Sequence, residues 1–142
     1  MRLGIVGHAA EKFTDETAGE ARLAIVEAIK QHKPDLIVSG RSPMGGVDIW
    51  AEEYASIYGI KMDAKVPRQH TWEGEYGFKA RNLDIANGSD LVLCIVVADF
   101  PPGFKGKVFP VCYHCRGRNP PHVKSGGCWT AWKCPQREWR IL

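Results

Sequence analysis

The chain has no long apolar segment and no strong excess of one charge. Its longest apolar run, residues 91–98, has the length of a strand, whereas a helix that spans a membrane needs roughly 20 apolar residues. The opening stretch, MRLGIVGHAAEKF, lacks the extended apolar region of a secretory signal. The formal net charge is only +3, so nucleic acid is not the favoured partner. We therefore expect a cytoplasmic protein that does not contact the membrane.

Several catalytic signatures are also missing. The sequence contains no Ser/His/Asp signature, no HExxH motif and no complete Walker loop. Its apolar content of 44% and charged content of 25% are ordinary for a globular protein. A length of 142 residues predicts one domain, covering residues 1–142. In a cytoplasmic protein the five cysteines are expected to be buried thiols or metal ligands rather than disulfides.

Short apolar runs alternate with amphipathic segments along most of the chain. Strands are expected at residues 2–7, 35–39, 60–66, 90–98 and 139–142, and helices at 17–32, 47–58, 77–87 and 125–133. Gly59 stands where a left-handed residue ends a helix. Apolar strands that alternate with helices predict a three-layer, doubly wound, mainly parallel sheet of the Rossmann-like class. A proline- and cysteine-rich insertion, residues 100–124, precedes the last helix.

Glycine-rich turns follow the first two predicted strands and precede the last helix. Ligands of open parallel sheets bind beyond the carboxyl ends of the strands, and glycine lets backbone N–H groups approach an anion closely. Arg81 offers a planar fork for phosphate, while Asp48 either caps its helix or accepts from a ribose hydroxyl. The residues expected to bind the ligand are Gly7, His8, Ser39, Gly40, Gly45, Gly46, Asp48, Trp72, Arg81, Asn82, Ser125, Gly126, Gly127 and Thr130.

The motifs SGRSPMGGVD, ARNLDIA and SGGCWTA resemble those of the SLOG superfamily. The similarity is greatest to its small YspA-like members, which are related to the LOG (lysine-decarboxylase-like) phosphoribohydrolases and to the DNA-processing protein DprA. It covers residues 1–98 and 125–133. The resemblance implies a Rossmann-like fold that binds a nucleotide or a nucleotide-derived phosphate ligand, as a sensor or a sequestering module.

One catalytic residue of the hydrolase relatives has a counterpart here and another does not. Their arginine corresponds to Arg81, but Lys133 stands where they carry a glutamate after the second glycine loop. Glu73, Glu75 and Asp99 are the possible substitutes. Two alternatives therefore stay open beside binding: a nucleoside 5'-monophosphate N-glycosidase, in which Arg81 is catalytic, and a zinc-knuckle module that binds nucleic acid.

The insertion carries a Cys-x2-Cys pair followed by a histidine and a further cysteine. Thiolates and imidazole at such spacing can hold zinc in tetrahedral geometry, which would fix a segment that has little apolar content of its own. His114 and Cys134 are the alternative ligands, and unligated reduced thiols are the alternative to a metal. The predicted structural zinc site consists of Cys112, Cys115, His122 and Cys128.

Five tryptophans are many for a chain of this length. Trp72 lies in a polar loop, where it either stacks on a base or packs in the core. Trp129, Trp132 and Trp139 near the end of the sequence either pack the last helix or form a subunit contact. We therefore expect a nucleotide-like small molecule as the ligand and a second copy of the chain as a partner.

Overall fold

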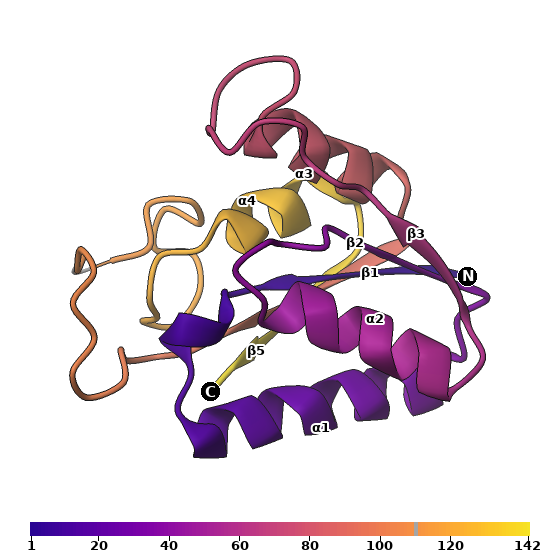
Figure 1. Ribbon diagram of the computed structural model, residues 1–142, viewed down its shortest axis with the longest axis horizontal. Coiled ribbons are helices and arrows are strands. Elements are labelled where there is room, and N and C mark those ends of the chain that lie inside the picture. Colours follow the sequence, from indigo (N-terminus) through magenta and orange to yellow (C-terminus); the bar gives the residue numbers. More distant parts are fainter. Residues whose placement is uncertain (110) are drawn as a thin grey trace.

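A computed structural model describes residues 1–109 and 111–142 (Figure 1). Five strands form one sheet in the order β3-β2-β1-β4-β5, and every neighbouring pair is parallel. The strands are β1 (Arg2–Gly7), β2 (Leu36–Ser39), β3 (Lys61–Ala64), β4 (Leu91–Val96) and β5 (Arg137–Ile141). The helices are α1 (Asp15–His32), α2 (Val47–Ile57), α3 (Phe78–Asn87) and α4 (Gly126–Lys133), with a short 3-10 turn at Ala10–Lys12. The predicted Rossmann-like α/β class is confirmed.

Helices cover both faces of the sheet. Figure 1 shows α1 and α2 on one face and α3 and α4 on the other. The first face buries aliphatic and aromatic side chains such as Ile25, Ile29 and Trp50 against β1 and β4. The second face has a core of a different kind, because all five cysteines of the chain are buried in it. The central strands β1, β2 and β4 therefore face apolar side chains on both sides, as their mostly apolar sequences predict, whereas the edge strands β3 and β5 are polar in part.

The element boundaries differ from the expected ones by a few residues, for local reasons. Helix α1 begins at Asp15 rather than Thr17, because the Thr14 hydroxyl accepts from the Thr17 N–H at 3.1 Å and the Thr17 hydroxyl accepts from the Thr14 N–H at 2.8 Å. Strand β3 covers only the four residues that pair with β2. Gly59 has the expected left-handed conformation, with φ +66.

The chain changes direction in the sheet between β1 and β4. From β1 it runs outward through β2 to β3, and it then returns so that β4 pairs with the other side of β1. The carboxyl ends of β1 and β4 therefore lie side by side, with Gly7 opposite Ile95. Such a topological switch point leaves a crevice beyond the strand ends where the loops diverge.

Residues 99–125 cross this edge of the sheet without forming a helix or a strand among their described members. They lie beside α4 as the irregular segment between β4 and α4 (Figure 1). In the part of the chain that the structure describes, no helix combines the length and hydropathy needed to cross a bilayer.

Candidate functional site

A cleft of about 230 Å³ opens at the switch point, beyond the carboxyl ends of β1 and β4. All three predicted glycine turns reach it, although they are far apart in the sequence. Eleven of the fourteen expected ligand-binding residues line this cleft: Gly7, His8, Gly45, Asp48, Trp72, Arg81, Asn82, Ser125, Gly126, Gly127 and Thr130. The other three, Ser39, Gly40 and Gly46, lie directly behind its wall and shape it.

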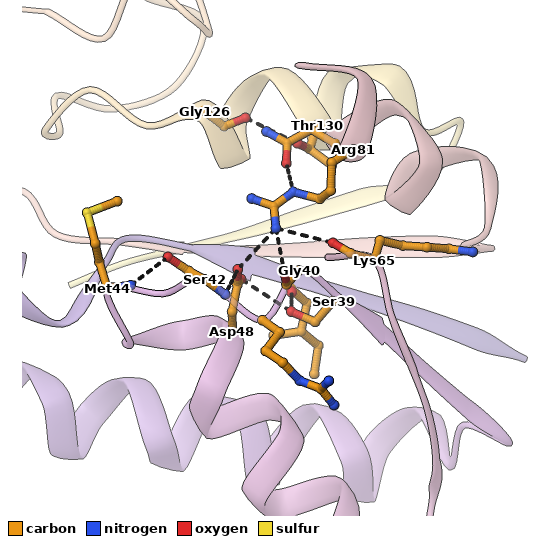
Figure 2. Close-up of polar contacts among 12 residues, drawn as sticks. Ser39, Gly40, Ser42, Met44, Asp48, Lys65, Arg81, Gly126 and Thr130 are labelled. Atoms are coloured by element: carbon orange, nitrogen blue, oxygen red, sulfur yellow. Dashed lines mark hydrogen bonds and ion pairs between the residues drawn. The ribbon is translucent and has the colours of Figure 1, made fainter. Parts of the chain in front are cut away.

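Arg81 is the central polar residue of the cleft. Its side chain is only 9% exposed, and Nη1 donates to the Gly40 carbonyl at 2.6 Å and the Lys65 carbonyl at 3.3 Å. Nε donates to the Asn82 side-chain oxygen at 2.8 Å. Figure 2 shows the guanidinium between Thr130 of α4 and Asp48 of α2, with its remaining nitrogen on the side where Met44 lies. That nitrogen, Nη2, has no acceptor among the described residues, so a buried cation presents a free donor to the cleft.

Asp48 is the one carboxylate among the described residues that line the cleft. One oxygen lies 3.2 Å from the Ser39 hydroxyl, the other accepts from the Ser42 N–H at 3.2 Å, and Arg81 Nη1 lies 3.9 Å away. Burial raises the pKa of Asp48, while the Arg81 charge and the hydrogen bond from the Ser42 N–H oppose the rise. Asp48 therefore holds the loop after β2 and balances Arg81, although it lies in the first turn of α2.

At two positions behind the cleft wall, neighbouring atoms lie so close to the main chain that only glycine fits. A Cβ at Gly40 would overlap Nη1 of Arg81 and would lie 2.7 Å from the Asp48 carboxylate. A Cβ at Gly46 would meet main-chain atoms of Ala9 and Ala10, and the φ of this residue is +84. Ser39 is fully buried and donates to the Ile5 carbonyl at 2.6 Å. These residues shape the site rather than reach into it.

His8 lines the cleft, but main-chain groups occupy both of its ring nitrogens. Nδ1 accepts from the Val97 N–H at 3.2 Å, and Nε2 lies 2.9 Å from the Lys124 carbonyl, to which it therefore donates. Burial lowers the pKa of His8 to about 4. His8 is thus a neutral side chain that ties the segment before α4 to the end of β4, and no ring nitrogen is left for a ligand in this conformation.

Two lysines that the motifs do not mark also line the cleft. Lys12 comes from the 3-10 turn after β1, and Lys124 comes from the residue before the cap of α4. With Arg81, they give the lining three cationic side chains against the single carboxylate of Asp48. Nothing in their local sequence distinguishes them from surface lysines. Their place in the cleft follows only from the way the chain crosses the sheet edge.

Helix α4 points its N-terminus at the cleft. The Ser125 hydroxyl caps the helix by accepting from the Gly127 N–H at 3.0 Å. The Gly126 N–H has no acceptor among the described residues, and Gly126 lines the cleft. A Cβ at Gly126 would lie 3.2 Å from the Trp72 ring. The glycine therefore brings a backbone donor and an aromatic ring close together at the same wall.

The substitutes considered for the missing glutamate lie elsewhere. Glu73 forms a surface ion pair with Lys79 at 3.6 Å, and neither Glu75 nor Asp99 lines the cleft. The Lys133 ammonium lies 5.2 Å from the centre of the Trp129 ring and also faces away from the cleft. Among the described residues, the cleft therefore has no second carboxylate that could activate water.

The predicted metal ligands lie together beside the cleft. The donor atoms of Cys112, Cys115, His122 and Cys128 are all within 4.8 Å of one another, and all four residues are buried. Nδ1 of His122 donates to the Pro120 carbonyl at 2.6 Å, so Nε2 faces the thiols of Cys128 at 3.2 Å and Cys115 at 3.8 Å. Such a hydrogen bond fixes a ligating imidazole in the orientation that metal binding needs. These residues could hold a metal ion.

The two alternative ligands have other contacts. The His114 ring packs against Trp72, with ring centres 5.1 Å apart. The Cys134 thiol lies 3.6 Å from the Ser89 carbonyl, away from the cluster. The hydrogen bond between Cys112 and Cys128, followed by burial, raises the pKa of Cys112 to about 12. A divalent ion would reverse that preference, because metal-bound thiols lose their protons.

Comparison with known proteins assigns no relative to this chain. It matches no family model, no curated protein sequence and no solved structure at a significant level.

Proposed function

We propose that the cleft binds a nucleotide or a nucleotide-derived phosphate ligand, and that the protein acts by binding it. The observation that supports this proposal most strongly is the state of Arg81. Its side chain is only 9% exposed and lines the cleft, and its Nη2 has no acceptor among the described residues. Asp48 lies on the Nη1 side of this guanidinium, so Nη2 remains available to form a charge-assisted hydrogen bond with a phosphate oxygen. The uncapped Gly126 N–H and the helix N-terminus favour an anion at the same wall. The resemblance of the motifs to the SLOG superfamily agrees with this proposal.

Binding is favoured over hydrolysis because of the carboxylates. A phosphoribohydrolase needs an acidic group at the departing sugar carbon or at its attacking water. Asp48 already interacts with Ser39, Ser42 and Arg81 through both of its oxygens. No other described residue offers a carboxylate to the cleft.

The test is calorimetric titration with a panel of mono-, di- and cyclic nucleotides, with inorganic phosphate as a reference. We expect at least one nucleotide to bind, and the Arg81→Ala variant to lose roughly tenfold or more in affinity. Lys12→Gln and Lys124→Gln remove charge without removing a structural contact to Asp48, and each should weaken binding roughly threefold to tenfold. Arg41→Ala is the matched control, because the Arg41 side chain pairs with Glu52 outside the cleft. Absence of binding across the panel would contradict the proposal.

We also propose that the ion held by the three cysteines and His122 is a structural zinc. Three thiolates and one imidazole form a closed tetrahedral set, and soft sulfur ligands select zinc among the common divalent ions. Elemental analysis of protein purified without added metal should find one zinc per chain. Zinc-free protein whose melting temperature does not change on addition of a chelator would contradict this assignment.

A further inference from the structure

The metal cluster and the ligand cleft share a set of aromatic contacts. Trp72 lines the cleft, and its ring is held between two residues next to metal ligands. His114, between Cys112 and Cys115, lies 5.1 Å from the Trp72 ring centre. Trp129, which follows Cys128, meets the same ring edge-on at 5.6 Å. Two parts of the cluster therefore converge on one side chain of the cleft.

The main chain of Trp72 is anchored elsewhere. Its carbonyl accepts from the Lys79 N–H at 3.0 Å, and the neighbouring Thr71 carbonyl accepts from the Phe78 N–H at 2.8 Å. These bonds join the loop to the first turn of α3. The Phe78 and Lys79 amides are thus protected while this loop stays packed, and the packing of its indole ring depends on His114 and Trp129, which lie beside metal ligands.

Aromatic residues of the cysteine-bearing segment before α4 also hold a lysine of the cleft. The Lys124 ammonium lies 4.4 Å from the centre of the Phe109 ring and 5.0 Å from that of Tyr113. These two rings pack edge-on against each other at 5.5 Å, and both belong to the segment that carries Cys112 and Cys115. Without an ion, this segment has no helix or strand among its described residues to fix it.

We infer that the metal ion holds one wall of the cleft in place, so that metal occupancy controls nucleotide binding. The inference rests on the proposed nucleotide site and adds its regulation. Two sites that stabilise the same arrangement are coupled, and the coupling is reciprocal. Zinc should therefore raise nucleotide affinity, and the nucleotide should raise zinc affinity by the same factor. The glycine loop after β2 contains no metal ligand and should keep its structure in either state.

The first measurement needs no ligand. Hydrogen exchange followed by mass spectrometry is compared for zinc-loaded and chelator-treated protein, with residues 70–79 as the reporter and residues 15–32 as the internal control. Removal of zinc is expected to speed exchange in residues 70–79 several-fold more than in α1, because the Phe78 and Lys79 amides are bonded to carbonyls of the loop whose indole ring packs against the metal cluster. A change in residues 70–79 that is no larger than the change in α1 overturns the inference. Cys115→Ser should reproduce the effect of chelation, whereas Cys134→Ser, a buried cysteine outside the cluster, should not.

A second variant leaves all metal ligands in place. His114→Ala removes one of the two aromatic neighbours of Trp72 and should weaken nucleotide binding roughly threefold to tenfold in the zinc-loaded protein. His32→Ala, far from the cleft, is its control. Affinity that does not change in His114→Ala overturns the inference even if zinc-free protein proves too unstable to study.

The binding experiment separates the two proposals. Calorimetry with the nucleotide panel on zinc-loaded and zinc-free protein should show a loss of affinity of roughly tenfold or more without zinc. Equal affinity in both states refutes metal control and leaves the nucleotide site intact. If no nucleotide binds to zinc-loaded protein while exchange in residues 70–79 still depends on zinc, the proposed function fails and the metal-held wall stands.

Discussion

The glycine loop after β2 and the cysteine-bearing segment before α4 reach the same cleft but are held there by different interactions. The glycine loop, residues 40–46, is fixed mainly by main-chain groups: Gly45 donates to the Ser42 carbonyl at 3.1 Å, and the Ala10 N–H donates to the Met44 carbonyl at 3.4 Å. The cysteine-bearing segment is fixed by side chains, namely thiols, an imidazole and aromatic rings. We therefore expect the first wall to be sensitive to substitutions that add atoms, and the second to be sensitive to metal removal and to pH.

The largest expected effect comes from the loss of the metal. A ligand present at 100 to 1,000 times its dissociation constant stabilises a protein by about 3–4 kcal/mol, so we expect chelation to lower the melting temperature by roughly 10 °C. Cys115→Ser should give the same decrease, and Cys134→Ser should retain both the zinc and most of the stability. Scanning calorimetry beside elemental analysis provides the measurement. A melting temperature equally insensitive to chelator in all three proteins would remove the distinction between the two walls.

The glycine wall is tested by Gly40→Ala. The added methyl group overlaps Arg81 Nη1 and must displace the guanidinium, which leaves Asp48 buried without its cation. Breaking a buried ion pair in this way costs roughly 3–5 kcal/mol, and the anion site should be lost with it. Gly19→Ala is the control, because a Cβ added to this residue of helix α1 would have no neighbouring atom within 4 Å. The control should be more stable by about 0.5–1 kcal/mol in urea unfolding.

The attachment of the cysteine-bearing segment to the end of β4 is tested by acid. The pKa of His8 is about 4 in the folded protein because of burial, against about 6.5 in an unfolded chain. The unfolded state therefore binds the proton more readily, and stability falls as the pH is lowered from about 6.5 to about 4. The loss is on the order of 3 kcal/mol.

Unfolding at several pH values checks the contribution of this histidine. His8→Asn keeps an acceptor for the Val97 N–H and should remove about one proton from the pH dependence in that window. His70→Gln, an exposed histidine outside the cleft, should leave the dependence unchanged. A slope that is the same in all three proteins would show that His8 is not the group responsible.

The smallest expected effect distinguishes two helix caps. Ser125→Ala removes the cap of α4 and should cost about 1 kcal/mol, together with a measurable loss of nucleotide affinity, because this helix end faces the cleft. Thr14→Ala removes the cap of α1 and should cost a similar amount with no change in affinity. Equal effects of the two variants on binding would argue against an anion at the α4 N-terminus.

Local patterns predicted the fold well because the three central strands are mostly apolar and the helices end next to proline or glycine. Residues 2–7 match β1 in full, and the α2 start at Val47 and the α4 end at Lys133 were also predicted. The Cys-x2-Cys pair with His122 and Cys128 marked the residues that could hold a metal, since a metal site constrains residue types at close spacing. The sequence alone could not exclude His114 and Cys134 as ligands. Their contacts in the folded chain, with Trp72 and with the Ser89 carbonyl, place them outside the cluster.

The cleft was predicted less completely, because long-range contacts assign its side chains. Arg81 was expected to face a ligand, but its bonds to the carbonyls of Gly40 and Lys65 leave no trace in the sequence. His8 was expected to contact the ligand, whereas its ring bridges two main-chain groups. Lys12 and Lys124 carry no motif, and the crossing of the sheet edge alone brings them to the site.

All five cysteines lie in one of the two cores, so the two faces of the sheet differ in their sensitivity to oxidants that attack thiols. Peroxide converts thiols to sulfenic and then sulfinic acids, which are polar and do not fit an apolar interior. The described buried residues between the sheet and α1–α2 contain no sulfur. Thiol oxidation should therefore be confined to the core beneath α3 and α4.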